Sequence, residues 1–430
     1  MQSMNNANKK PELLAPAGGW EQLRYAIYFG ADALYCAGNQ FGLRQRADNF
    51  SLDDIASATE LAHKNKVKLF VTCNAYMNSD DLTKLPPYFE ALAEANVDAL
   101  IISDMGAFRL AKKYAPDVAL HVSTQASCSN AEAALTWYEL GARRVVCARE
   151  MSIADIATMR QALPRDMEME VFVHGAMCMA ISGRCLISDY LTGRSANRGH
   201  CTQPCRWEYT LEEASRPGEL FAAEQDQRGT YLMNSKDLCM LDHVEDLIEI
   251  GVDSLKIEGR NKKAFYVATV VNAYRQVLNG ADPAFFLNEL ETISHRPYST
   301  GFFYGFAEQD TDKGDCGQAY DWVGEVLEET HDGRVKVACR NRFYEGDTLE
   351  ILSPHYVLGD KGDTGVDDFN NAGAVTSLEV RDLRLEFSDG GFEPSETANK
   401  AMDTYSFATE LALHPHDILR VKRIDPLRKN

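Results

Sequence analysis

The chain reads Val67-Lys-Leu-Phe-Val-Thr-Cys73, then an amphipathic stretch over Leu82–Ala95, then the apolar run Ala99–Ser103. Two short runs rich in β-branched and apolar residues, separated by a helical stretch, indicate a strand–helix–strand unit with parallel strands. The same alternation continues outward in both directions, from Pro11 to about Gly280. These residues therefore predict an α/β protein.

Eight runs have the character of buried parallel strands. They are Glu12–Pro16, Ala33–Ala37, Val67–Cys73, Ala99–Ser103, Val118–Ser123, Arg144–Ala148, Met169–His174 and Asp253–Ile257. Eight strand–helix units are the number in a (β/α)₈ TIM-like barrel, which is the fold that we predict. A doubly wound open sheet is the alternative, but no GxGxxG motif follows the first strand.

One unit is much longer than the others. About 80 residues separate the seventh and eighth runs, and the excess forms a cysteine-rich insertion over residues 175–240. Insertions at the carboxyl ends of barrel strands are where barrel proteins normally build their sites. We expect the barrel and its insertion to occupy residues 1–300.

After about residue 300 the pattern changes to short strands separated by Asp/Gly turns such as His331-Asp332-Gly333. The expected strands are Val323–Leu327, Val335–Ala338, Asp347–Ile351, Ala374–Val380 and Leu383–Phe387. Short strands with turns of this kind are typical of an all-β domain. We predict a small C-terminal β-barrel domain over residues 301–430.

The composition limits the location and the partners of the chain. Its 430 residues carry a formal net charge of −20, which opposes nonspecific binding to nucleic acid or anionic lipid. The polar beginning has no signal-peptide pattern and no apolar run is long enough to span a bilayer. We therefore expect a cytoplasmic protein without a membrane partner, in a compartment where thiols stay reduced.

Four of the eleven cysteines are clustered. Cys178, Cys185, Cys201 and Cys205 have the spacing C-x6-C-x15-C-x3-C. In a reducing compartment this pattern favours metal binding over disulfides, and thiolates bind both zinc and iron–sulfur clusters. The spacing leans towards a cluster but leaves zinc, and simple burial of the thiols, open.

The residues around this cluster match a known signature. Glu170–Cys185 follows E-x-F-x2-G-[SA]-x-C-x4-G-x-C, and Glu12–Gly18, Gly30–Tyr35 and Lys256–Arg260 match further segments of the same family. The sequence thus resembles the peptidase U32 (collagenase-like) family over nearly its whole length.

The resemblance implies an iron–sulfur protein that supports hydroxylation. One branch of the family helps to make 5-hydroxyuridine at the tRNA wobble position from prephenate, and another hydroxylates a cytidine of ribosomal RNA. A barrel with a compact C-terminal domain is most similar to the tRNA branch. The resemblance also implies a [4Fe–4S] cluster on the four clustered cysteines. A third branch, which serves quinone synthesis, departs in one ligand, and this keeps Cys36 and Cys239 as alternatives; we expect Cys239 to pack at the start of the helix before strand eight.

Polar residues after the predicted strands are candidates for the site, because such positions face the mouth of a barrel. We predict catalytic roles for His174, Glu150, Glu258 and Arg260. We predict substrate contacts for Arg44, Arg46, Asn74, Gln125 and Arg149, where guanidinium groups suit a dicarboxylate such as prephenate. Asp104 and Ser123 occupy similar positions. For each residue the alternative is a local structural hydrogen bond.

Two other functions stay open. A collagenase-like peptidase needs an activated nucleophile with a base, for example a cysteine with His174. The sequence contains neither HExxH nor GxSxG. The second alternative is a zinc-stabilised RNA-binding scaffold.

The insertion has a local charge opposite to that of the chain. Between residues 184 and 206 it carries Arg184, Arg194, Arg198 and Arg206 against Asp189, and Trp207 and Tyr209 follow. Basic and aromatic side chains in one segment suit contact with unpaired bases, so we expect tRNA, at its anticodon region, as a partner. The alternative is a surface loop packed on the C-terminal domain.

Overall fold

The computed structural model describes residues 10–43, 48–178, 182, 184–207, 225–226, 229–230, 235–305, 318–355 and 376–423. Contacts divide the chain into two compact units, each described separately. The first comprises residues 1–27, 31–271 and 295–316, and the second comprises residues 28–30, 272–294 and 317–430. The boundary between the units is not a single point near residue 300. The second unit includes the end of one long helix, and the first unit includes residues 295–316.

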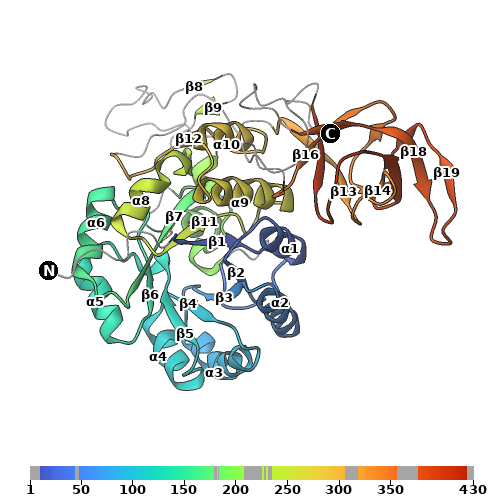
Figure 1. Ribbon diagram of the computed structural model, residues 1–430. Coiled ribbons are helices and arrows are strands. Elements are labelled where there is room, and N and C mark those ends of the chain that lie inside the picture. The colour runs from blue at the N-terminus through green and yellow to red at the C-terminus, as the bar shows by residue number, and fades with distance from the viewer. Residues whose placement is uncertain are drawn as a thin grey trace. The chain divides into compact units, whose positions relative to one another are not determined.

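The first unit contains eight parallel strands that close into a barrel (Figure 1). They are β1 (Glu12–Pro16), β2 (Ala33–Ala37), β3 (Lys68–Cys73), β4 (Ala99–Ile102), β5 (Ala119–Val122), β6 (Arg144–Val146), β7 (Glu168–Ala176) and β11 (Ser254–Ile257). Each pairs with its neighbour in order, and β11 pairs with both β7 and β1, which closes the ring. The predicted (β/α)₈ barrel is confirmed.

Helices cover the outside of the strands in Figure 1. They are α1 (Trp20–Tyr28), α2 (Leu52–Lys64), α3 (Ser79–Glu94), α4 (Met105–Tyr114), α5 (Ala131–Glu139), α6 (Ile153–Ala162), α8 (Val244–Ile250) and α9 (Ala264–Leu278). Capping boxes at Ser51, Asn78 and Ser152 begin α2, α3 and α6. Each box satisfies backbone N–H groups that the first helical turn leaves unpaired.

Side chains fill the inside of the barrel. One layer consists of Leu14, Ala33, Tyr35, Phe70, Ala99 and Ile101. A neighbouring group is charged: Arg144, which is 2% exposed, lies 2.7 Å from Glu12 and 2.9 Å from Glu170. The Lys256 ammonium lies 2.7 Å from Glu170. Buried charges require such partners because leaving one unpaired costs several kcal/mol.

Two short strands extend the barrel sheet beyond β7. They are β10 (Asp237–Cys239), antiparallel to the end of β7, and β12 (Tyr298–Ser299), parallel to β10. Buried Arg296 donates to the Asp237 carboxylate at 2.5 Å and fastens this pair of strands. Cys239 is therefore in a strand opposite His174, and our expectation that it opens a helix is wrong. Its strand pairs with the last residues of β7, which are distant in sequence, so no local sequence pattern reveals the pairing.

The second unit contains an eight-stranded antiparallel sheet with the order β17-β16-β22-β13-β14-β21-β18-β19. These strands are β13 (Tyr320–Val326), β14 (Arg334–Cys339), β16 (Thr348–Leu352), β17 (Ser377–Glu379), β18 (Arg381–Glu386), β19 (Phe392–Pro394), β21 (Thr404–Ala408) and β22 (Ile418–Lys422). The sheet curves around an apolar core that includes Val337, Phe343 and Phe407 (Figure 1). The C-terminal domain is thus an antiparallel half-barrel.

Two smaller pairings accompany these sheets. β15 (Phe343–Tyr344) pairs with β20 (Thr397–Ala398), and β8 (Gln225–Asp226) pairs with β9 (Gly229–Thr230). The helix α10 (Pro283–Leu290) belongs to the second unit. Within the described ranges, no helix combines the length and the apolar character needed to cross a membrane.

Candidate active site at the barrel mouth

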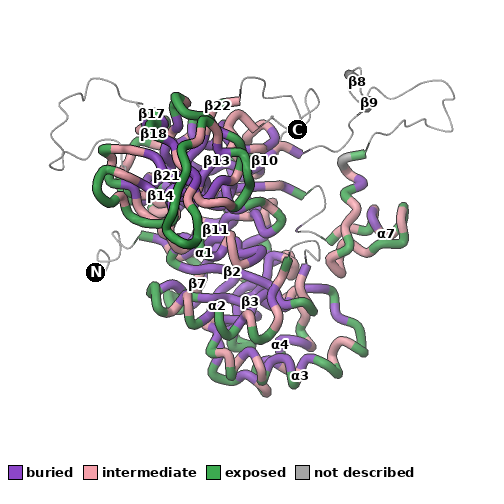
Figure 2. The backbone as a smooth tube through the Cα atoms, turned by 90° about the vertical axis from the view of Figure 1, so that its right-hand side faces the viewer, coloured by how far each residue is buried: buried purple, intermediate pink, exposed green. Residues whose placement is uncertain are grey.

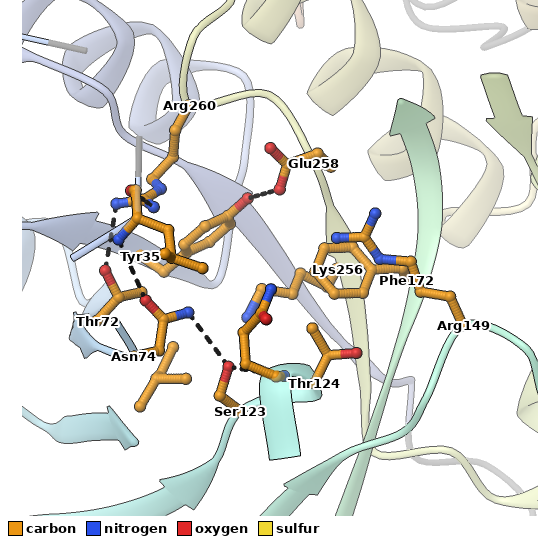
Figure 3. Close-up of a pocket in the computed structure, with 13 residues that line it drawn as sticks. Tyr35, Thr72, Asn74, Ser123, Thr124, Arg149, Phe172, Lys256, Glu258 and Arg260 are labelled. Carbon is orange, nitrogen blue, oxygen red and sulfur yellow. Dashed lines mark hydrogen bonds between the residues drawn. The ribbon is translucent and has the colours of Figure 1, made fainter. Parts of the chain in front are cut away.

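A pocket opens among the carboxyl ends of the barrel strands (Figure 3). Its lining comes from β2, β3, β4, β7 and β11 and from the segments that follow β2, β3, β5, β6 and β11. The lining residues are Tyr35, Leu43, Thr72, Asn74, Ile101, Ser123, Thr124, Gln125, Arg149, Phe172, Lys256, Glu258 and Arg260. A pocket at this end of the strands is where barrel enzymes carry their sites.

A chain of hydrogen bonds fixes one side of the pocket. The Asn74 amide donates to the Ser123 hydroxyl at 3.2 Å and accepts from the Leu43 N–H at 3.4 Å. The Arg260 guanidinium donates to the Thr72 hydroxyl at 3.2 Å and to the Leu43 carbonyl. Asn74 and Arg260 are thus held in place by neighbours from three strands, which gives a pre-organised polar wall (Figure 3).

Two cations face the opposite side. The Arg149 guanidinium lies 4.2 Å from the centre of the Phe172 ring and donates to the Ala176 carbonyl at 3.1 Å. Its Nε is buried and has no hydrogen-bond partner among the described residues. Lys256 lies over the Tyr35 ring at 4.4 Å, and burial lowers its pKa although Glu170 opposes that shift. The pocket therefore offers donors to an anionic or carbonyl-bearing ligand.

Glu258 is the carboxylate of the lining. It accepts a hydrogen bond of 3.3 Å from the Tyr35 hydroxyl, which also donates to the Ile257 carbonyl at 2.9 Å. Gly175, with a φ of 107°, lets β7 pass this point, because a Cβ there would stand 2.5 Å from the Glu258 carbonyl oxygen. The glycine of the signature stretch therefore serves the close approach of two strand ends.

The structure brings together some of the predicted site residues and separates others. Glu258, Arg260, Asn74, Gln125 and Arg149 all line the pocket. The other predicted positions lie elsewhere: His174 and Glu150 are not in the lining, and Asp104 caps α4. Arg44 and Arg46 lie outside the described residues.

His174 is packed rather than presented to the pocket. Its ring centre lies 5.3 Å from that of Tyr298 and 6.0 Å from that of Tyr266. Burial lowers the pKa of His174 to about 3, although the Asp237 carboxylate opposes the shift. The imidazole is consequently neutral at physiological pH and is not a proton donor there.

Glu150 fastens the cysteine segment, which we define as residues 178–207, to the barrel. Its carboxylate accepts from the Ser182 N–H at 2.6 Å and from the Ser182 hydroxyl at 2.7 Å. Two more loops hold the same segment. After β5 the Gln125 carbonyl accepts from Arg184 at 3.0 Å, and after β3 the Tyr76 carbonyl accepts from Arg198 at 2.9 Å. Asp81, in the first turn of α3, also pairs with Arg198 at 2.7 Å. The loops after β3, β5 and β6, which also carry Asn74, Gln125 and Arg149, therefore hold the segment at the barrel mouth.

Internal contacts give the segment its own compact form around α7 (Ile187–Thr192). Asn197 accepts from the Cys185 N–H at 3.1 Å and donates to the Cys185 carbonyl at 2.9 Å. The Ser188 hydroxyl accepts from the Thr202 N–H at 3.1 Å. The Gln203 N–H donates to the Cys201 sulfur at 3.3 Å. Hydrogen bonds thus fix the backbone next to two of the candidate ligands, Cys185 and Cys201.

The four clustered cysteines differ from the rest in exposure. Cys178 is exposed, and Cys185, Cys201 and Cys205 are partly exposed, whereas the remaining described cysteines, including Cys36 and Cys239, are buried. Burial raises the pKa of Cys36 to about 12 despite the nearby Arg260 charge. Among the described residues no three His, Cys, Asp or Glu side chains converge as a metal-binding group. The donor chemistry of the four accessible thiols fits a metal or cluster, and the ligation stays a prediction.

The predicted RNA-contacting residues have different environments. Arg184 and Arg194 are exposed, and the Arg184 Nε donates to the Gln125 carbonyl at 3.0 Å. Arg198 is engaged with Asp81 and the Tyr76 carbonyl. Trp207 is 42% exposed. Tyr209 and the Arg206 side chain lie outside the described part of the chain. Arg198 is accordingly an anchor of the segment in this conformation.

Sequence reasoning missed several lining residues, among them Lys256, Tyr35, Thr72 and Phe172. Lys256 belongs to the matched stretch Lys256–Arg260 and alternates with the apolar residues of β11. A lysine inside a buried strand is the signal that could have identified this pocket residue, since lysine is seldom buried without a role or a partner.

The fold and site define a class: a TIM-barrel protein with a cysteine-bearing segment at its mouth and a C-terminal β-domain. The model of peptidase family U32 matches residues 18–332, and the model of the U32 C-terminal domain matches residues 318–420. The chain belongs to peptidase family U32, which confirms the resemblance seen in its motifs.

The sequence is similar to those of three proteins with names that describe RNA modification. The chain is 41% identical to tRNA hydroxylation protein P1 of Bacillus subtilis, over 80% of this chain and 84% of the relative. It is 36% identical to tRNA hydroxylation protein P of Escherichia coli, over 80% and 86% of the two chains. It is also 36% identical to the 23S rRNA 5-hydroxycytidine C2501 synthase of Escherichia coli, over 84% of this chain and 55% of the relative.

Proposed function

We propose that this chain is an RNA-hydroxylation protein that converts the wobble uridine of tRNA to 5-hydroxyuridine, with an iron–sulfur cluster and prephenate as cosubstrate. The names of the three relatives support RNA hydroxylation, and the two tRNA proteins each align with 80% of this chain. The observation that carries the proposal is the joint placement of the pocket and the cysteine segment on the same three loops.

The four accessible thiols are the proposed ligands. Cys178, Cys185, Cys201 and Cys205 would hold a [4Fe–4S] cluster, which supplies single-electron chemistry when bound. The Gln203 N–H that reaches the Cys201 sulfur is the kind of donor that tunes a thiolate ligand. Buried Cys36 and Cys239 are poorer candidates in this conformation because burial disfavours their thiolates.

The pocket residues have a direct part in binding the cosubstrate. Arg149, with its buried and unmatched Nε, and Arg260 present guanidinium groups to the same space. Such groups bind carboxylates with two parallel hydrogen bonds. Lys256 adds a third cation, and Glu258 is the carboxylate placed to accept a ligand hydroxyl. The wall of Asn74 and Ser123 orients the ligand between these charges.

The test is nucleoside analysis of tRNA from cells that lack this chain, with and without the wild-type chain restored. Restoration of 5-hydroxyuridine by the wild type, and not by an otherwise stable Cys201→Ser variant, supports the proposal. Unchanged 5-hydroxyuridine in the absence of the chain would refute it. Anaerobic purification with iron, sulfide and zinc analysis accompanies the test: about four irons per chain are expected, and stoichiometric zinc alone would favour the zinc-stabilised scaffold.

A peptidase is the second candidate, and one observation favours it beyond the family name. Cys239 and His174 are directly opposite each other in antiparallel β10 and β7, so their side chains share one face. A thiol and an imidazole are the residue types that a cysteine peptidase pairs, but burial lowers the pKa of His174 to about 3, so this imidazole is a weak base for the thiol. Gelatin cleavage that survives removal of iron but is lost in Cys239→Ser would support this function. Absence of cleavage by the wild-type chain would exclude it.

A further inference from the structure

The outer face of the cysteine segment carries large apolar side chains that the barrel does not cover. Leu186 is 69% exposed and Tyr190 is 85% exposed. They are four residues apart, Leu186 as the N-cap of α7 and Tyr190 within the helix, so they lie on the same side of its first turn. Ser188, on the opposite side, is buried. Its hydroxyl donates to the Arg194 carbonyl and accepts from the Thr202 N–H. The helix is thus fixed through Ser188 and leaves Leu186 and Tyr190 exposed. Figure 2, coloured by burial, shows exposed and partly buried residues along the segment labelled α7.

Further exposed aromatic rings are part of the same region. Trp207 ends the described part of the segment and is 42% exposed. Tyr76, in the loop between β3 and α3, is 69% exposed, and its backbone N–H donates to the Asn197 carbonyl at 2.8 Å. Large exposed aromatic side chains gathered on one small region mark an interaction surface more often than chance exposure does.

Charge identifies the kind of partner. The chain as a whole has a net charge of −20, whereas residues 184–207 contain four arginines and the single acidic residue Asp189. Arg184 and Arg194 flank α7 and are exposed. A basic surface with outward aromatic rings, on an otherwise acidic protein, suits a polyanion whose bases are unpaired and able to stack.

We infer that Leu186, Tyr190 and the flanking Arg184 and Arg194 form a stacking surface for unpaired RNA nucleotides. Tyr190 packs against a base, and the two arginines contact the adjoining phosphates. Because the segment is fastened to the loops of the pocket, RNA bound there lies next to the barrel mouth. This inference rests on the proposed function for the identity of the polyanion, and it assigns the binding to residues outside the pocket.

The experiment uses the full-length protein and a fluorescent RNA hairpin with an unpaired loop, compared with the same strand annealed to its complement. Tyr190→Ala should weaken hairpin binding about tenfold with the salt dependence unchanged, since one stacked base is lost. Arg194→Gln should lower the salt slope by about one, since one phosphate contact is lost. Tyr344→Ala, at an exposed tyrosine of the second unit, is the matched control and should bind like the wild type.

Three outcomes overturn the inference. Hairpin binding by Tyr190→Ala equal to the wild type removes the stacking role. Equal losses for hairpin and duplex remove the preference for unpaired bases. Loss of a dimer in sedimentation for Tyr190→Ala, with RNA binding intact, assigns the surface to a second copy of the chain. The proposed function fails separately, if cells without the chain keep 5-hydroxyuridine in their tRNA.

Discussion

Glu150 accepts two hydrogen bonds from Ser182, one from its N–H and one from its hydroxyl, at 2.6 and 2.7 Å. Ser182 is part of the signature stretch between Cys178 and Cys185, and its φ of 43° is unusual for a residue other than glycine. A carboxylate that accepts from both groups offsets the cost of that backbone conformation. Glu150 is therefore a positioning residue, which joins the rim of the barrel to the cysteine segment.

Glu150→Gln should loosen the cysteine segment without unfolding the barrel. The amide offers one acceptor oxygen and no charge, so the loss is about 1–2 kcal/mol. We expect faster hydrogen exchange over residues 184–207 and less iron retained per chain. Glu132→Gln, at an exposed glutamate of α5, is the control. Exchange and iron content equal to the wild type would show that Ser182 does not depend on this contact.

Arg198→Glu should release the segment from the loop after β3. The guanidinium holds Asp81 at 2.7 Å and lowers the pKa of that carboxyl, so replacing it puts two carboxylates together. Arg194→Glu, which makes the same charge change on the same segment away from the ion pair, is the matched control for this contact. We expect proteolysis within the segment to accelerate for Arg198→Glu and to stay near the wild-type rate for Arg194→Glu. Equal rates would contradict the anchoring role.

The same pair gives the segment a dependence on pH. Pairing lowers the pKa of Asp81, so its contribution is present above the ordinary carboxyl pKa of about 4 and is lost as the pH falls through the lowered value. Added salt should weaken the contact further, because Arg198 is partly exposed.

The barrel could be predicted because its strands are buried on both faces and appear as continuous apolar runs. Strands β1 and β2 have the predicted bounds, and β11 differs by one residue at its start. Strands β10 and β12 could not be found, because they have three and two residues and form only by pairing, β10 with the end of β7 and β12 with β10. In the second unit β21 and β22 were missed, since their exposed and buried residues do not alternate cleanly.

Those site residues could be predicted whose position follows from the order of the parallel strands alone. Asn74, Gln125 and Arg149 follow separate strands and meet at the mouth, as parallel strands require. The roles of His174 and Glu150 could not be read from position, because each is set by a partner distant in sequence. Tyr298 packs on His174, and Ser182 binds Glu150.

Arg149→Lys and Arg149→Gln should separate charge from shape in the pocket. Lysine keeps the charge but loses the planar stack on Phe172 at 4.2 Å and the bidentate geometry, so we expect tRNA hydroxylation to fall about tenfold or more. Glutamine should reduce it further, while iron content stays at the wild-type level. Arg143→Gln, at an exposed arginine immediately before β6, is the control. Normal hydroxylation by Arg149→Gln would remove the carboxylate-binding role.

His174 should make the protein sensitive to mild acid. Burial lowers its pKa to about 3, so between the ordinary value of about 6.5 and pH 3 the unfolded chain binds a proton that the folded chain does not. The contribution of the neutral imidazole to the free energy of unfolding is fully present above pH 6.5. It decreases below that pH, by about 2 kcal/mol at pH 5. His174→Gln should flatten this part of the profile in urea unfolding. Buried His121 acts in the same direction and leaves a residual slope. An unchanged profile in the variant would contradict the buried, neutral state.

Lys256→Met should test whether the cation at the pocket floor supports the fold as well as the ligand. The change leaves Glu170, which is 0% exposed, with Arg144 alone, and removing one partner of a buried pair costs about 3–5 kcal/mol. Adding Glu170→Gln should recover part of that loss, because the neutral amide no longer requires a cation. Lys68→Met, at an exposed lysine that pairs with Glu12 at 3.3 Å, should cost less than about 1 kcal/mol. The measurement is urea unfolding followed at the barrel transition. If the double variant is no more stable than Lys256→Met, the two residues are not coupled, and any loss of hydroxylation by Lys256→Met then reflects the ligand alone.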